Sequence, residues 1–247
     1  MAPRRLATID SLRGIAIVWM TVFHFCFDLN HFGWIKQNFY TDPFWTWQRT
    51  AIVSLFLFCA GLGQAVAAAQ DQSWRRFWKR WAQIAGCALL VTAGSYWMFP
   101  RSFIYFGVLH GIALMLVIVR LTAGWGRSLW LAGAVALAMK PLAVLAHQRW
   151  PELEFLNQMA WNWLGLIDRK PVTEDYVPLF PWLGVMWWGL AAGQWLLAER
   201  RQWVERAVPA AAAPLAWLGR WSLSWYMLHQ PVLIAAMTAL SYVIARP

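Results

Sequence analysis

The sequence predicts an all-α protein, a polytopic transmembrane helical bundle of about seven spans. Of the 247 residues, 60% are hydrophobic and only 13% are charged, whereas soluble domains are about 45–50% apolar and about 25% charged. The mean hydropathy is +0.44. The chain also contains 21 tryptophans, which fits many crossings in a small protein because tryptophan prefers the boundary between lipid and water.

Seven apolar segments approach the length of about 20 residues that a helix needs to cross a bilayer. The expected spans are 9–29, 48–69, 82–99, 102–121, 128–147, 178–198 and 221–244. The fifth is interrupted by Lys140 and Pro141, so this helix is expected to kink or to end at Met139, with the remainder at the membrane interface. We expect residues 1–247 to form a single integral membrane domain.

Positive charges between the apolar segments orient the bundle. The net charge is +10, but the bases lie in short connections, which favours membrane topology over nucleic-acid binding. Seven spans place the following bases on one side: Arg4, Arg5, Arg75, Arg76, Lys79, Arg80, Arg120, Arg127, Arg200, Arg201, Arg206 and Arg220. That side is expected to be cytoplasmic. The N-terminus is then cytoplasmic, the C-terminus is external, and the first helix is retained rather than cleaved.

The first span carries Asp10, Arg13, His24 and Asp28 within an otherwise apolar segment. At about 100° per residue, all four side chains share one narrow helix face, and Arg13 and His24 lie about 16 Å apart along the axis. Ionisable groups inside a membrane are costly and usually face a bundle interior or a wet cavity. The pattern therefore indicates a polar functional face, and salt bridges that lock the bundle are the alternative.

Two later spans carry further polar groups. His110 is flanked by glycines, which allow close approach of a helix or a ligand; it is a cavity residue or a histidine hydrogen-bonded across helices. Tyr226 and His229 share a helix face, and Gln230 follows Tyr226 by four residues. These residues either line the same cavity or form hydrogen bonds between helices.

Several kinds of site are not indicated. Cys26, Cys59 and Cys87 lie in apolar segments and are interpreted as packing thiols. Because no Cys/His pattern of metal-ligand spacing occurs, we predict no metal. Phosphate-binding glycine motifs and a GxSxG motif are also missing from the sequence. The segment from about 148 to 177 is long for a bundle, and it is either a functional lid or a solvated surface loop.

Four segments, in this order, resemble the heparan-alpha-glucosaminide N-acetyltransferase catalytic-domain family of bacteria. They are LATIDSLRGIAIVWMTVFHFCFDL, YFGVLHGIAL, PLFPWLGVMWWGL and WLGRWSLSWYMLHQPVL. The wider transmembrane acyltransferase superfamily includes acyltransferase family three, in which the first helix carries an arginine and a histidine at the spacing of Arg13 and His24. Its next helix and basic loop resemble SLFLFCAGLGQA and RRFWKRWAQI.

The resemblance implies a transmembrane acyltransferase that moves an acyl group from cytoplasmic acyl-CoA to a hydroxyl or amine at the outer face. With that reading, His24 is the general base for a sugar or glycoconjugate acceptor, because an imidazole titrates near neutral pH. Asp28 orients the His24 ring and stabilises its charged form. Arg13, fixed by Asp10, holds a phosphate or carbonyl of the donor. A covalent acetyl-His24 intermediate stays open.

The resemblance also implies a co-substrate and binding partners, and the sequence leaves two alternative functions. Acetyl-CoA is the expected co-substrate, held by Arg75, Arg76 and Arg80, and His110, Tyr226, His229 and Gln230 line the acceptor cavity. Partners are membrane lipid, acyl-CoA and the acceptor, without nucleic acid; a homodimer is compatible with the sequence. The expected location is the bacterial inner membrane. The alternatives are a proton-coupled carrier of a small polar solute and a non-catalytic scaffold.

Overall fold

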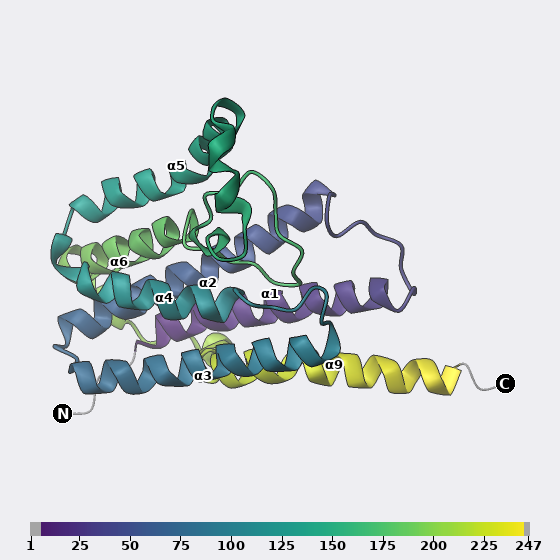
Figure 1. Cartoon of the computed structure of the whole chain (residues 1–247). Helices are drawn as coiled ribbons and strands as arrows, with labels where there is room; N and C mark the ends of the chain where they lie inside the picture. Colours follow the sequence, from purple (N-terminus) through teal and green to yellow (C-terminus); the bar gives the residue numbers. More distant parts are fainter. Residues whose placement is uncertain (1–5, 245–247) are drawn as a thin grey trace. The chain divides into compact units, whose positions relative to one another are not determined.

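A computed structural model describes residues 6–244, most of which are helical (Figure 1). The long helices are α1 (Ala7–His31), α2 (Pro43–Ala69), α3 (Trp74–Met98), α4 (Val108–Leu121), α5 (Ser128–Arg149), α6 (Trp182–Glu199) and α9 (Ser222–Ile244). Shorter helices are η1 (Ala123–Trp125), η2 (Pro151–Asn157), η3 (Asn162–Leu164), α7 (Arg201–Glu205), η4 (Ala210–Ala212) and α8 (Ala213–Arg220). Within residues 6–244 the strand-like pairing is one isolated bridge, so the all-α prediction is confirmed. Arg4 and Arg5 lie outside the described residues.

The predicted apolar segments all coincide with long helices, but several ends differ from the prediction. Helices α2 and α3 begin earlier than the expected 48 and 82, and α6 begins later than the expected 178. Helix α4 has 14 residues, because residues 102–107 of the expected span precede the helix. Helix α5 continues through Pro141 to Arg149 instead of ending at Met139; one proline removes only one backbone hydrogen bond. Among residues 6–244, three helices, α1, α2 and α5, are long and apolar enough to cross a membrane. The count of seven spans stays a prediction.

The chain divides into two compact units. Within the described residues, the first contains Leu57–Trp203, and the second joins residues 6–56 with residues 204–244. The boundary falls inside α2, so the division does not separate the chain into an N-terminal and a C-terminal half. The expectation of one domain over residues 1–247 stays a prediction.

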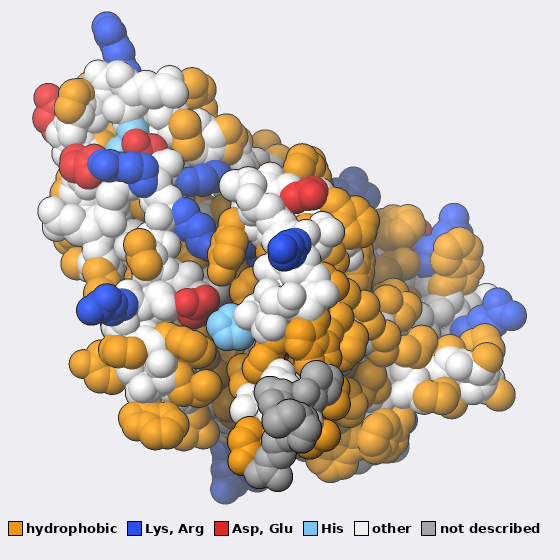
Figure 2. All heavy atoms as spheres, turned by 90° about the vertical axis from the view of Figure 1, so that its right-hand side faces the viewer, with side chains coloured by type: hydrophobic (Ala, Val, Ile, Leu, Met, Phe, Trp, Pro, Cys, Tyr) orange, Lys and Arg blue, Asp and Glu red, His pale blue; other side chains and the backbone are white. Residues whose placement is uncertain are grey.

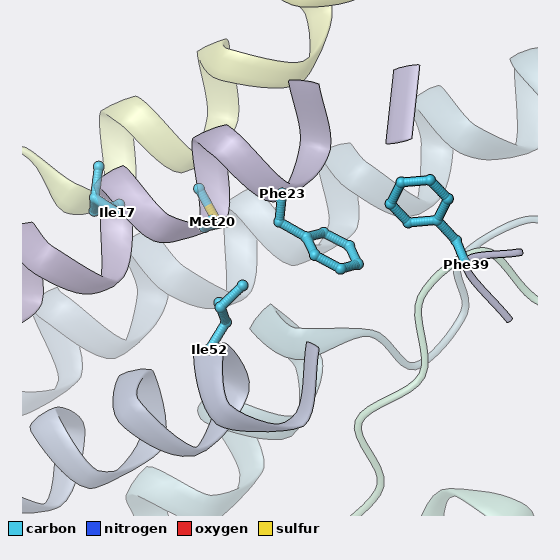
Figure 3. Close-up of a cluster of buried hydrophobic side chains, with 5 residues drawn as sticks. All are labelled: Ile17, Met20, Phe23, Phe39 and Ile52. Carbon is cyan, nitrogen blue, oxygen red and sulfur yellow. The ribbon is translucent and has the colours of Figure 1, made fainter. Parts of the chain in front are cut away.

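In the second unit, α1 packs on α2 through an aromatic and aliphatic cluster. Ile17, Met20 and Phe23 extend from α1, Ile52 comes from α2, and Phe39 comes from the connecting loop (Figure 3). The Phe39 side chain is 2% exposed and stacks on Trp45, with ring centroids 4.0 Å apart. Burying such side chains is worth about 1.5–3 kcal/mol each in water. The cluster therefore fixes α1, and with it the ionisable face, within its unit.

Glycines bring α8 against the N-terminal half of α1. A Cβ on Gly14 would overlap the backbone of Leu215, and a Cβ on Gly219 would overlap the backbone of Asp10. Close backbone approach at small residues is the usual way in which helices pack inside membranes. This crossing places the end of α8 beside Asp10 and Arg13.

Helices α1 and α9 run parallel. Trp225 Nε1 donates to Thr21 Oγ1 at 2.9 Å, and Gln230 Nε2 donates to Asp28 Oδ1 at 2.7 Å. The residue numbers increase in the same direction on both helices, so the two helices are parallel. A bundle with an odd total of spans, such as the predicted seven, has parallel first and last spans. The orientation of the bundle in the membrane stays a prediction.

In the first unit, the segment between α5 and α6 is held against the chain that precedes α4. The Glu174 N–H donates to the Ser102 carbonyl at 2.9 Å, and the Val177 N–H donates to the Phe106 carbonyl at 3.1 Å. Asp175 Oδ2 accepts from the Val108 N–H at 2.7 Å. This carboxylate satisfies an end-of-helix donor and explains why α4 begins at residue 108 rather than 102. These contacts hold residues 174–177 in place, and the choice between a functional lid and a solvated surface loop stays a prediction.

Large apolar side chains cover much of the surface. Figure 2 shows many hydrophobic side chains on the visible face, with charged side chains scattered among the rest. Trp97 is 86% exposed, Leu131 70% and Leu89 67%. Exposed apolar area on this scale is a liability in water, but it is what lipid contact requires. The surface therefore agrees with an integral membrane protein.

Candidate functional site

His24 meets His229 across the α1–α9 contact. Their facing ring nitrogens, His24 Nδ1 and His229 Nε2, lie 2.8 Å apart. The ring centroids are 4.9 Å apart. With facing nitrogens this close, the two rings meet edge to edge through a hydrogen bond rather than by stacking their faces. The sequence placed both histidines on polar faces, but it gave no reason to pair them.

Backbone carbonyls fix which nitrogens carry protons. His229 Nδ1 lies 2.8 Å from the Tyr226 carbonyl oxygen and 3.2 Å from that of Trp225. Carbonyl oxygens only accept, so His229 Nδ1 carries hydrogen and, in the neutral ring, His229 Nε2 accepts. His24 Nδ1 must then donate to it. The remaining nitrogen, His24 Nε2, keeps its lone pair and is able to take a proton from a ligand.

Asp28 binds a different partner from the one expected. We expected Asp28 to orient the His24 ring, but that hydrogen bond comes from His229, and Asp28 Oδ1 accepts from Gln230 Nε2. The expectation used only the i, i+4 spacing on one helix, whereas the His24 ring turns toward α9. Asp28 is 3% exposed. Asp28 Oδ2 and Gln230 Oε1 are buried without a hydrogen-bond partner among the described residues.

Arg13 and Asp10 form the expected pair in the N-terminal half of α1. Arg13 Nη1 lies 2.9 Å from Asp10 Oδ1 and donates to the Gly219 carbonyl at 3.4 Å. Arg220 Nε lies 3.8 Å from the other carboxylate oxygen of Asp10. Both contacts of Arg13 use Nη1, so the N–H groups on Nη2 and Nε point away from Asp10 and Gly219. Asp10 thus anchors two guanidinium groups at this end of the unit.

His110 uses both ring nitrogens inside the first unit. Thr92 Oγ1 donates to the Ile104 carbonyl at 2.7 Å, so it accepts from His110 Nε2 at 3.0 Å. The Gly107 N–H donates to His110 Nδ1 at 3.3 Å. A histidine with both nitrogens engaged in this way holds the α3–α4 connection in place. The geometry supports the hydrogen-bonding alternative over the cavity role for His110.

The predicted donor contacts lie on the first two turns of α3. Arg75, Arg76 and Arg80 are exposed there. Trp74 directly precedes Arg75, Trp78 lies between Arg76 and Arg80, and each tryptophan is 44% exposed. Arg120 lies 5.4 Å above the Trp74 ring. Alternating tryptophan and cationic side chains are typical of the membrane–water boundary, where either phosphate of a donor or phosphate of a lipid is accessible.

Tyr226 contributes its backbone carbonyl to the histidine pair, and its ring centroid lies 5.8 Å from that of His229. Its carbonyl accepts from His229, and its ring packs against the cluster of Ile17, Met20 and Phe23. Sequence reasoning missed the role of the Trp225 and Tyr226 carbonyls, because no side-chain pattern signals the use of a backbone oxygen. The one sequence signal nearby is the proline two residues after His229. Because it lacks an N–H, it leaves the Met227 carbonyl without its usual helical donor, which indicates an altered backbone.

Residues 5–231 match the family model for heparan-alpha-glucosaminide N-acetyltransferase, catalytic. The chain belongs to this family. The matched range contains His24, Asp28 and His229, and the resemblance predicted from the sequence segments is confirmed. Membership indicates a membrane acetyltransferase and agrees with the apolar helices. Neither the curated proteins nor the solved structures gave a match.

Proposed function

We propose that this protein transfers an acetyl group from cytoplasmic acetyl-CoA to a hydroxyl or amine of a sugar or glycoconjugate at the outer face of the membrane. The observation that supports the proposal most directly is the free Nε2 lone pair of His24. Its partner His229 keeps the other ring nitrogen protonated. A buried imidazole with one nitrogen fixed and the other free is the arrangement that a general base needs.

In the proposed reaction, His24 Nε2 takes the proton from the acceptor group as that group attacks the acyl carbon. A new carbon–oxygen or carbon–nitrogen bond forms, the carbon–sulfur bond of the thioester breaks, and the proton passes on to the CoA thiolate. His24 becomes positively charged in between. An ionised Asp28, one turn further along α1, would favour this imidazolium by its negative charge. His229 accepts a hydrogen bond that strengthens as the charge develops.

The donor is proposed to interact with cationic side chains. Arg13, anchored by Asp10 and Gly219, is directed by two contacts and retains further N–H groups for a phosphate or carbonyl oxygen. Arg75, Arg76 and Arg80 are exposed and suit the CoA phosphates. The remaining proposals are a cytoplasmic N-terminus, an external C-terminus and residence in a bacterial inner membrane.

The experiment measures transfer from labelled acetyl-CoA by purified protein in detergent or proteoliposomes. Replacing His24 by Ala is expected to lower turnover by about 10²- to 10⁴-fold, which is the usual worth of a general base. Binding of acetyl-CoA and thermal unfolding should change little. His31→Ala, at the exposed end of α1, is the matched control. Near-normal turnover of the His24→Ala protein would show that the catalytic assignment is wrong.

One observation favours a second candidate, a proton-coupled carrier. The His24–His229 hydrogen bond joins two protonatable rings, and Asp28 keeps one carboxylate oxygen unpaired nearby on the same helix. Chains of such groups carry protons in transporters. A carrier would move protons across proteoliposomes without consuming acetyl-CoA, whereas the proposed enzyme releases free CoA thiol in proportion to the acceptor that it modifies.

A further inference from the structure

Three potential metal ligands converge outside the proposed reaction site. His147 lies in the last turn of α5, Glu154 lies in η2, and Asp168 lies in the segment after η3. One ligand atom from each of the three residues can be chosen so that all lie within 4.8 Å of one another. The three residues belong to the first unit and take no part in the chemistry proposed for His24.

His147 directs its Nδ1 toward this group, and among the described residues that nitrogen forms no hydrogen bond beyond the long contact with Asp168. Its side chain is only 4% exposed, and its Nε2 lies 3.0 Å from the Leu166 carbonyl oxygen. The carbonyl requires a hydrogen on Nε2, so in the neutral ring Nδ1 carries a lone pair. That lone pair faces Asp168 Oδ1 at 3.7 Å. In the neutral ring two electron-rich atoms therefore face each other, at a place where the Asp168 side chain is 33% exposed and that of Glu154 is 61% exposed, and a proton or a metal cation between them satisfies both.

Hydrogen bonds to neighbouring groups orient the three candidate ligands, as such bonds do in metal sites. A metal-binding histidine almost always donates its other N–H to a carbonyl or carboxylate, as His147 does to Leu166. Asn157 Nδ2 donates to Asp168 Oδ1 at 2.8 Å and approaches Glu154 Oε2 at 3.3 Å. These hydrogen bonds hold both carboxylates beside the His147 ring.

Two cations border the group. Arg169 forms an ion pair with Glu154, and its Nε lies 3.7 Å from Asp168 Oδ1. Lys140 Nζ donates to the Ile167 carbonyl at 2.6 Å. The Arg169 side chain is 67% exposed, so it can leave Glu154 without disturbing the core. Arg169 and a bound cation would compete for the same carboxylate.

We propose that His147, Glu154 and Asp168 bind one divalent metal ion of the zinc type, which fastens the segment after α5 to the end of that helix. Zn²⁺ takes imidazole nitrogen and carboxylate oxygen at about 2.0–2.2 Å, which places two ligands of a tetrahedral ion about 3.3–3.6 Å apart. The 3.7 Å between His147 and Asp168 is close to that spacing. The single imidazole favours zinc over Mg²⁺ or Ca²⁺.

The test is a titration of the full-length protein, freed of any purification tag and stripped with a chelator, with Zn²⁺. Calorimetry should show one saturable site per chain, and the same Zn²⁺ concentrations should raise the thermal unfolding temperature. His147→Ala and Asp168→Asn should abolish both effects. Asn157→Ala should weaken binding by about 10- to 100-fold, because it removes support from a ligand. His31→Ala, at an exposed histidine, should change neither effect.

Arg169→Gln separates the metal site from an ion-pair network. If Arg169 competes with zinc for Glu154, this exposed variant folds normally and binds Zn²⁺ more tightly than the unaltered protein. The proposal is overturned if the unaltered protein shows no saturable site, or if His147→Ala and Arg169→Gln leave zinc affinity unchanged. In either case the three residues would form only an ion-pair network with Arg169. None of these readouts depends on acetyl transfer.

Discussion

The His24–His229 hydrogen bond predicts how turnover responds when His229 is replaced. Leu at position 229 removes the acceptor of the His24 Nδ1 hydrogen while keeping a similar apolar volume. Without that acceptor, nothing favours the His24 tautomer with hydrogen on Nδ1. In the alternative tautomer the hydrogen lies on Nε2, the nitrogen that must act as the base. Gln at position 229 retains a side-chain oxygen that can accept the same hydrogen bond.

The magnitude follows from the bond that is lost. A buried donor without its partner costs about 1–3 kcal/mol, and about 1.4 kcal/mol corresponds to a tenfold change in rate. If that free energy no longer selects the active tautomer, His229→Leu should lower turnover by about 5- to 150-fold. This loss is smaller than the one expected for His24→Ala, because the base itself is still present.

The assay compares kcat, KM for acetyl-CoA and thermal unfolding on the same preparations. We expect His229→Leu to lower kcat with little change in KM, and His229→Gln to restore most of the turnover. His31→Leu introduces the same side chain at an exposed position of α1 and serves as the control. The reasoning is refuted if His229→Leu lowers the unfolding temperature but leaves turnover per folded molecule unchanged, because the bond would then be purely structural.

Three further predictions concern topology, packing and the donor. Reporter fusions at residues 72, 124 and 203 should be cytoplasmic and those near 38 and 160 external, as the loop charges require; a cytoplasmic result at 160 would contradict the odd span count. Gly14→Ala should lower the free energy of unfolding by about 1–3 kcal/mol, because its Cβ overlaps the Leu215 backbone. Gly86→Ala meets open space in α3 and should raise the free energy of unfolding by about 0.5–1 kcal/mol. Equal unfolding temperatures for the two variants would contradict the close crossing. Replacing Arg75 and Arg76 together by Gln should raise the KM for acetyl-CoA in a salt-dependent way; an unchanged KM would leave these side chains only a role in topology.

The sequence by itself determined the class of protein and the position of its helices. Composition and the length of the apolar segments are local properties, and a bilayer admits few folds, so the helices followed directly. The shared face of Asp10, Arg13, His24 and Asp28 also followed from helical geometry alone. The Arg13–Asp10 pair was predictable because its partners lie three residues apart on one helix.

Tertiary structure decided which partner each polar group on that face binds. Helical spacing suggested Asp28 for His24, but the parallel packing of α9 brought His229 to His24 and Gln230 to Asp28. Such contacts join residues about 200 positions apart, and the order of residues along the chain does not report which helices become neighbours. For the same reason His147 and Asp168 carry no recognisable metal spacing, because the fold of the segment between them brings their ligand atoms together.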